Sequence, residues 1–331
     1  MALRQYVNRN EVMLMQKLST KTLLAVLCCS CLAVLMASCM VTRNVAPTPY
    51  RATAGPALPE RDIVFMTDIN QLGFINADGS GYMAYTVDMS KWPDQNSGFV
   101  PSLYDMVTWS PDGRFLTGRY TVSHRSGGLP ILLSTAGQLL GCPIELSPYA
   151  TNRVWAITDT TVIAVDANDK TSRVVAFDIS SCTITNTVYS SEGGIGETTI
   201  STKGWLAISK GGVLIISAGH TLTVTIPNAN FPAWSPSGEL IAYSIIGDGL
   251  YVANKDGSAP RKLVDDSDPH SLNVSSWSPD EKWLVYDRRI SVGDQITSVI
   301  YKVNVMTGES YELFRGGYRP NWRWTIPAPE K

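Results

Sequence analysis

Four aspartates are the side chains of this sequence whose clustering could support acid–base chemistry. Asp265, Asp266 and Asp268 lie within four residues, and Asp294 follows in a later polar segment. Two carboxylates held about 5 to 10 Å apart can cleave a glycosidic bond as acid and base, or as acid and nucleophile. The same cluster could bind calcium, although a solvated acidic loop is the more usual structure. A hydrolase or lyase acting on envelope or extracellular glycans is therefore one alternative function, and it requires these groups to converge in a pocket.

Other patterns of catalytic or ligand-binding residues are weak. The three histidines, His124, His220 and His270, have no ligand partner at close spacing, so we expect no metal site. The segment Glu192–Gly196 is rich in glycine but lacks the Lys-Ser/Thr pair of a phosphate-binding loop. No Gly-x-Ser-x-Gly motif is present. We therefore expect no cofactor and assign no catalytic residue.

Two cysteines, Cys142 and Cys182, lie outside the N-terminal region and are 40 residues apart. An oxidising compartment would permit a disulfide between them. They lie in successive repeat units, whose outer strands can diverge beyond bonding distance. The sequence leaves this disulfide open.

A repeated motif indicates which elements would position such groups. Trp109–Gly113, Trp234–Gly238 and Trp277–Glu281 read WSPDG, WSPSG and WSPDE, and each precedes a short apolar run. A tryptophan strand, a turn with Pro and Gly, and a second strand are typical of a β-propeller blade. Proline preorganises such a turn, and glycine accepts its positive-φ position. We expect the tryptophan rings to pack between neighbouring blades.

The spacing of the motif predicts the number of blades. Trp234 and Trp277 are 43 residues apart, and Trp277 and Trp322 are 45 apart. The interval of 125 residues from Trp109 to Trp234 has room for two degenerate copies. We place these copies at 153–157 followed by TTVIAVD, and at 198–204 followed by WLAIS.

The two ends of the repeat region complement each other. Residues 63–87 contain the later three strands of a blade but no tryptophan strand, while Tyr318–Trp324 contains a tryptophan strand with no blade after it. Pairing the two removes exposed sheet edges. The sequence thus predicts an all-β fold: a six-bladed β-propeller of four-stranded antiparallel blades, whose first blade is completed by the C-terminal strand.

These units resemble TolB-like β-propeller repeats over roughly residues 60 to 325. The resemblance rests on the WSPDG turns, on the Asn-x-Asp-Gly-Ser turns Asn76–Ser80 and Asn254–Ser258, and on the closing strand around Pro320–Trp322. It implies the propeller fold but no particular activity. TolB itself has an α/β domain before its propeller, and the segment 41–60 is too short for one.

The blade topology predicts where a binding surface would lie. In a four-stranded blade, the short motif turns share one face, and the B–C loops and the links between blades share the other. The long irregular segments 88–104, 120–129, 265–273 and 288–297 all belong to this second face, which we call the long-loop face. Variable loops on a rigid scaffold favour binding there. The candidate contact residues are Trp92, Tyr104, Arg125, His270, Arg288 and Arg319.

The N-terminus has the pattern of a targeting segment. Lys17 and Lys21 precede an uncharged apolar stretch at 23–40, as in a signal peptide. Leu35–Cys39 resembles the bacterial lipobox, which implies lipidation of Cys39. An uncleaved membrane anchor and simple secretion are the alternatives. Residues 40–60 are rich in Pro, Ala and Thr, which predicts a spacer.

Charge and composition limit the partners. Residues 1–22 have a net charge of +3, so the rest of the chain carries −5, which disfavours nucleic-acid binding. We expect a targeting segment at 1–39, a tether at 40–60, a propeller at 61–326 and a tail at 327–331. The favoured function is a non-enzymatic, extracytoplasmic module anchored to the cell membrane that binds a protein, peptide or glycan. A purely structural role is a further possibility.

Overall fold

A computed structural model of the chain describes residues 50–324, apart from positions 54, 70, 89–101, 111, 122–127, 143–154, 157–160, 168–169, 219–220, 267–271 and 293–294. The chain divides after Ala46 into two units, and the described residues belong to the second, Pro47–Lys331. No helix among the described residues is long and apolar enough to cross a membrane. The apolar stretch at 23–40 and Cys39 lie outside the described residues.

The described strands form six antiparallel sheets, which we number as blades 1 to 6. Blade 1 contains β25 (Gly317–Trp322), β2 (Ile63–Thr67), β3 (Leu72–Ile75) and β4 (Met83–Tyr85). Blade 2 contains β5 (Ser102–Trp109), β6 (Phe115–Thr121), β7 (Gly128–Ser134), β8 (Gln138–Gly141) and β1 (Tyr50–Thr53). Blade 3 contains β9 (Trp155–Ala156), β10 (Thr161–Ala167), β11 (Thr171–Asp178) and β12 (Thr183–Glu192). Blade 4 contains β13 (Thr198–Ile200), β14 (Trp205–Lys210), β15 (Val213–Ala218) and β16 (Thr221–Ile226). Blade 5 contains β17 (Ala229–Trp234), β18 (Leu240–Ile245), β19 (Gly249–Asn254) and β20 (Arg261–Asp265). Blade 6 contains β21 (Leu272–Trp277), β22 (Trp283–Val292), β23 (Gln295–Asn304) and β24 (Ser310–Arg315).

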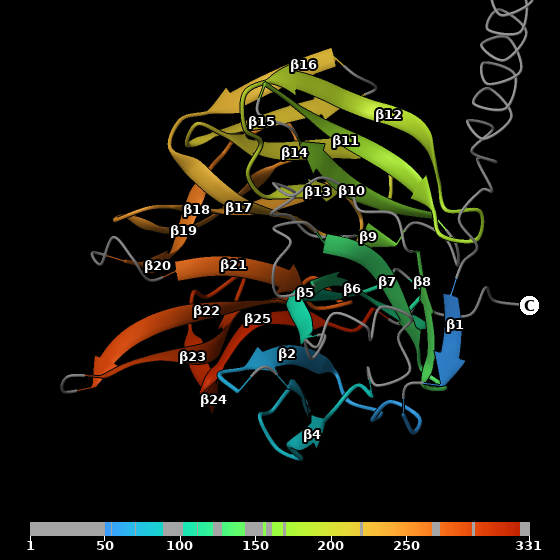
Figure 1. Cartoon of the computed structure of the whole chain (residues 1–331). Coiled ribbons are helices and arrows are strands. Elements are labelled where there is room, and N and C mark those ends of the chain that lie inside the picture. The colour runs from blue at the N-terminus through green and yellow to red at the C-terminus, as the bar shows by residue number, and fades with distance from the viewer. Residues whose placement is uncertain are drawn as a thin grey trace, which may run out of the picture. The chain divides into compact units, whose positions relative to one another are not determined.

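The C-terminal strand completes the first blade, as the repeat count predicts. Strand β25 pairs antiparallel with β2, with Trp322 opposite Ile63 and Gly317 opposite Thr67. In Figure 1, β25 at the red end of the chain runs beside β2 at the blue end. This pairing joins the two ends of the described region and removes two sheet edges that could pair with other chains.

The apolar core is divided among the junctions between blades. Six buried clusters are present among the described residues, and each combines side chains of two neighbouring blades. One pair from each, in ring order from blades 1 and 2, is Phe74–Trp109, Leu132–Phe177, Val165–Leu206, Ala207–Trp234, Leu250–Trp277 and Val285–Phe65. Because the sixth cluster joins blade 6 to blade 1, the six blades form a closed ring.

The motif residues have the structural roles that the sequence predicts, with one exception. Trp109, Trp234 and Trp277 are at most 4% exposed, and each packs in a cluster between two blades. Gly113 and Gly238 occupy the left-handed position of their turns, with φ of 66° and 70°. The exception is Glu281, which occupies the same position with φ of 58° although it has a Cβ atom.

Two segments differ from the sequence expectation. The segment 288–297 is predicted as an irregular loop, but residues 288–292 and 295–297 lie in β22 and β23, which pair from Trp283 through Val292. For these residues the prediction was wrong, because Ile290, Val292 and Ile296 extend the strand pattern. Residues 50–53, in the predicted spacer, form β1 on the edge of β8. The chain after β1 also contacts the blades, since Leu58 N–H donates to the Thr135 carbonyl at 2.8 Å.

A disulfide joins blades 2 and 3. Cys142 follows β8 and Cys182 lies in the turn between β11 and β12, with a Cα–Cα distance of 5.5 Å. Both side chains are fully buried. The bond forms because Cys182 lies in a turn that reaches the neighbouring blade, and not within a diverging outer strand.

Candidate functional site

Arg319, one of the predicted contact residues, lies in the inner strand β25 of blade 1. Its backbone has φ of 53° and it precedes Pro320, just as Phe231 of blade 5 has φ of 51° and precedes Pro232. The strand register shifts at both places. A non-glycine residue with positive φ is strained, and such residues concentrate at ligand-binding positions. The same strained bulge therefore occurs on the inner strands of blades 1 and 5.

The side chain of Arg319 meets Glu197 of blade 4 at 3.9 Å. In a ring of six, blades 1 and 4 lie opposite each other, so this ion pair crosses the ring. Arg319 N–H donates to Asp287 Oδ1 at 2.9 Å, and Asn273 Nδ2 donates to Asp287 Oδ2 at 2.9 Å. Arg319 lies near the start of β25, and Glu197 directly precedes β13. The links between blades enter the inner strands at these ends, so the ion pair lies toward the long-loop face.

Arg288, a second predicted contact residue, is held in an ion pair. Its guanidinium contacts Asp266 Oδ1 at 3.0 Å, and the Asp266 side chain is 3% exposed. Asp265 is 92% exposed and contacts Lys262 at 3.3 Å. The two neighbouring aspartates therefore have separate surroundings. Asp268 and Asp294 lie outside the described residues, so the proposed convergence of the acidic cluster stays a prediction.

The structure describes no side chain of the other four predicted contact residues. Trp92, Arg125 and His270 lie outside the described residues, and Tyr104 is described in β5 by its backbone alone. Among the described residues, no group of three or more His, Cys, Asp or Glu could hold a metal ion.

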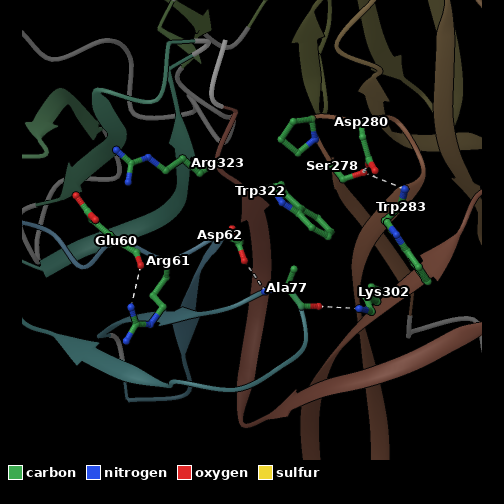
Figure 2. Close-up of a pocket in the computed structure, with 11 residues that line it drawn as sticks. Glu60, Arg61, Asp62, Ala77, Ser278, Asp280, Trp283, Lys302, Trp322 and Arg323 are labelled. Atoms are coloured by element: carbon green, nitrogen blue, oxygen red, sulfur yellow. Dashed lines mark hydrogen bonds between the residues drawn. The ribbon is translucent and has the colours of Figure 1, made fainter. Parts of the chain in front are cut away.

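A cavity of ≈ 700 Å³ lies between blades 6 and 1 on the face of the short turns (Figure 2). This face is opposite to the predicted binding surface. The lining residues are Glu60, Arg61, Asp62, Ala77, Ser278, Pro279, Asp280, Trp283, Lys302, Trp322 and Arg323. We call it the seam pocket, because it lies where the two ends of the propeller meet. The sequence analysis does not predict this pocket. Closure of blade 1 by the C-terminal strand does imply that the chain is interrupted between the first strand of this blade, β25, and its second strand, β2.

One wall of the seam pocket is organised around Ala77. Lys302 Nζ donates to the Ala77 carbonyl at 2.7 Å, and Ala77 N–H donates to Asp62 Oδ2 at 2.7 Å (Figure 2). Lys302 Nζ also lies 4.7 Å from the centre of the Trp283 ring, a distance at which a cation is attracted to the ring face. These contacts fix the charged groups and the aromatic ring relative to each other.

A second part of the lining is the turn that follows Trp277, where Trp283 N–H donates to Ser278 Oγ at 3.0 Å. Burial alone would raise the pKa of Asp280, but the hydrogen bond from Ser278 and the backbone bond from Lys282 outweigh it and lower this pKa. Ser278 Oγ donates to Asp280 Oδ1 at 2.6 Å. Asp280 is therefore an ionised carboxylate that is already engaged by its own turn.

Arg323 connects the pocket to the next blade. Its Nε donates to the Gly113 carbonyl at 3.1 Å, and its guanidinium lies 4.7 Å from the centre of the Trp109 ring. The inner rim of the seam pocket is therefore anchored to the turn of blade 2.

Comparison with known proteins shows the fold. No family model matches the sequence, and no curated protein matches it. The structure is similar to that of TolB from Acinetobacter baumannii, with 13% identity, a TM-score of 0.56, and coverage of 79% of this chain and 66% of that chain. It is also similar to the putative TolB from Agrobacterium tumefaciens, with 15% identity, a TM-score of 0.52, and coverage of 78% of this chain and 90% of that chain. The chain thus spans 66% of the length of the Acinetobacter protein, and at these identities the likeness is to the β-propeller alone.

Proposed function

We propose that this chain is a non-enzymatic binding module, held outside the cytoplasm at a membrane by its N-terminus, that engages a protein, peptide or glycan through its long-loop face. The observation that carries this proposal is the ion pair between Arg319 and Glu197. It brings a predicted contact residue and a carboxylate from the opposite blade together at the long-loop side of the ring. Charged groups held by a rigid frame are suited to recognition.

The backbone around Arg319 supports a recognition role. The φ of 53° is strained, yet it is held in place by Pro320 and by the bond from Arg319 N–H to the buried Asp287 carboxylate. A strained residue persists where the surrounding structure fixes it, often at ligand contacts. Arg319 is 26% exposed, so it remains accessible at the ring.

The disulfide supports the extracytoplasmic part of the proposal. Bonds such as Cys142–Cys182 persist in oxidising compartments and are rare in the cytosol. The apolar stretch at 23–40, the preceding lysines and the lipobox-like Leu35–Cys39 supply the anchor. Lipid attachment at Cys39 is tested by incorporation of labelled palmitate, which Cys39→Ala should abolish.

A capture experiment tests the long-loop face. The full chain, solubilised in detergent, is immobilised and exposed to an envelope extract, and retained proteins and glycans are identified. Arg319→Ser should reduce capture of a specific ligand at least about tenfold, since removing a charged contact costs about 1.5–3 kcal/mol. Arg114→Ser is the matched control, because Arg114 is exposed in the short turn between β5 and β6, on the opposite face of the ring, where it contacts Asp112 at 2.6 Å. Equal loss with both variants, or with neither, would contradict the proposal.

A further inference from the structure

Three exposed isoleucines lie at equivalent places on the long-loop face. Ile246, Ile296 and Ile69 lie at the ends of the hairpins that join the second and third strands of blades 5, 6 and 1, which are consecutive in the closed ring. We call these hairpin ends the B–C tips. The isoleucines are 59%, 74% and 73% exposed. Single exposed apolar side chains are common on soluble proteins, but their repetition on neighbouring loops indicates an interaction site.

The fold itself does not use these three side chains. In blade 5, Asp248 N–H donates to the Ile245 carbonyl at 3.0 Å, and in blade 1, Thr67 N–H donates to the Gln71 carbonyl at 2.9 Å. The turns are thus closed by their own backbone, and turns of this kind favour Gly, Asn and Asp over isoleucine. None of the three isoleucines belongs to a buried apolar cluster of the described residues. Their side chains are therefore available to an outside partner.

The tips of blades 6 and 1 are fixed to each other by a shared residue. Gly316, in the link between the two blades, accepts from Asp68 N–H at 3.0 Å and donates to the Ser298 carbonyl at 2.8 Å. Asp68 directly precedes Ile69, and Ser298 lies two residues after Ile296. Because both bonds meet at one glycine, the two isoleucines lie on neighbouring parts of one frame. The hairpin that carries Ile296 is also the longest, with ten residues in each strand, and it extends to the left in Figure 1.

The tip of blade 5 is joined to the same hairpin of blade 6. Asp266 N–H donates to the Asp248 carbonyl at 2.8 Å, and the Asp266 carboxylate contacts Arg288 of β22 at 3.0 Å. Asp248 is two residues from Ile246. The three tips therefore form a continuous set that is held by bonds between blades.

The tips of blades 1 and 5 have an excess of negative charge. Asp68 is exposed beside Ile69, and Asp265, at the end of β20, is 92% exposed. Lys262 contacts both Asp248 and Asp265, so one positive charge faces two negative charges. Complementary charges guide the approach of a partner and set its orientation. A partner that fits these tips should therefore have basic groups beside its apolar groups.

We propose that the B–C tips of blades 5, 6 and 1 bind a basic amphipathic helix of a partner protein. Such a helix has apolar residues along one stripe with basic residues beside it, which complements isoleucines that lie next to aspartates. Isoleucine has neither a hydrogen-bonding group nor an aromatic face for a glycan. The exposed carboxylates disfavour an anionic lipid surface. The proposal rests on the proposed function, because it specifies the partner of the long-loop face.

Cross-linking from one tip tests the proposal with a defined probe. The full chain in detergent carries p-benzoylphenylalanine in place of Ile296, and the probe is the peptide LKKLLKLLKKLLKLLKKL, a basic amphipathic helix. Only peptide that touches the photoreactive group is counted, so peptide dissolved in the micelle does not contribute. We expect saturable cross-linking from position 296. The same group in place of Met306, which is 80% exposed in the turn between β23 and β24 on the short-turn face, should give none.

Matched variants separate the apolar from the charged contribution. The double variant Ile69→Ser, Ile246→Ser should raise the peptide concentration at half-maximal cross-linking from position 296 about tenfold or more, because two apolar contacts are lost. Met306→Ser should leave this concentration unchanged. Peptides in which every lysine is replaced by glutamate, or every leucine by serine, should cross-link at least about tenfold less well at equal concentration.

Three results would overturn the proposal. They are equal yields from positions 296 and 306, a preference for the glutamate peptide, and lipid adducts at position 296 in dioleoylphosphatidylglycerol vesicles. The proposed function fails or stands on a different measurement, the capture of envelope ligands by Arg319→Ser. If that variant loses capture while position 296 never reacts with the peptide, the long-loop face is a binding surface and the helix-binding tips are refuted.

Discussion

Arg319 and Glu197 form a 3.9 Å ion pair between two blades that lie on opposite sides of the ring. In the rest of the described core, contacts join neighbouring blades, so this pair links parts of the ring that share no apolar cluster. The side chains are 26% and 15% exposed. Burial of a charge to this extent lowers the free energy of unfolding unless an opposite charge compensates it. Removal of one partner should therefore destabilise the fold.

A double-mutant cycle tests the coupling of these charges. Arg319→Met and Glu197→Gln should each lower the free energy of unfolding by about 1–3 kcal/mol, and the double variant should lose less than the sum, with a coupling of about 1 kcal/mol. Urea unfolding followed by tryptophan fluorescence gives these values. Additive losses would show that the two side chains act independently.

Removal of the disulfide should destabilise the ring where blades 2 and 3 meet. Cys142 and Cys182 close a separation of 40 residues, for which chain-entropy arguments give about 2–4 kcal/mol. Guanidinium unfolding of the Cys142→Ser, Cys182→Ser double variant should show this loss. Thiol titration of unfolded, unreduced wild-type protein provides the control, since both cysteines should be unreactive; reactive thiols at these positions would contradict the bond.

Glu281 combines strain with a stabilising contact. Its φ of 58° favours glycine, and its carboxylate accepts from Ser237 N–H. Glu281→Ala loses the contact and keeps the strain, so we expect a loss of about 1–2 kcal/mol. Glu281→Gly should be the more stable of the two variants by about 1 kcal/mol, because glycine adopts positive φ without steric cost. Thermal unfolding of the three proteins measures this order, and an alanine variant more stable than the glycine variant would refute it.

The architecture follows from the sequence because its signals are local and repeated. Trp109, Trp234 and Trp277 precede turns whose conformation depends on a few adjacent residues. The spacing of these tryptophans predicts the number of blades. Polar residues in 288–297 predict a loop around Arg288, but cross-strand pairing with Val299 overrides this local pattern. The Cys142–Cys182 bond and the Arg319–Glu197 pair depend on distances between blades. No local pattern in the sequence predicts these distances. No local pattern predicts the seam pocket, because its residues 60–62 precede the first blade and meet the turn of blade 6 only through closure of the ring by β25.

Acid should weaken a surface network on the short-turn face. Hydrogen bonds from Lys203 and Lys255 lower the pKa of Glu239 from 4.5 to about 2. Because the folded-state pKa is depressed, this contribution to stability is present above pH 4.5 and is lost as the pH falls toward about 2. The groups are exposed, so salt should screen the effect. Melting temperatures measured between these pH values should fall less steeply in Glu239→Gln, and less steeply in high salt; identical slopes would argue against the network.

The docking of the N-terminal segment on blade 2 depends on Gly137. Its φ is 77°, and a Cβ atom there would lie 2.4 Å from the Gly55 carbonyl oxygen and 2.5 Å from that of Pro56. Both contacts are with backbone, so relief requires movement of the chain between β1 and Leu58. Gly137→Ala should therefore increase proteolytic cleavage within residues 50–60, while Gly211→Ala, at a positive-φ turn with nothing within 4 Å of an added Cβ atom, controls for strain alone. Limited proteolysis with mass spectrometry compares the two. Cleavage equally enhanced in both would assign the effect to backbone strain, and unchanged cleavage in Gly137→Ala would show that the segment does not rest on this turn.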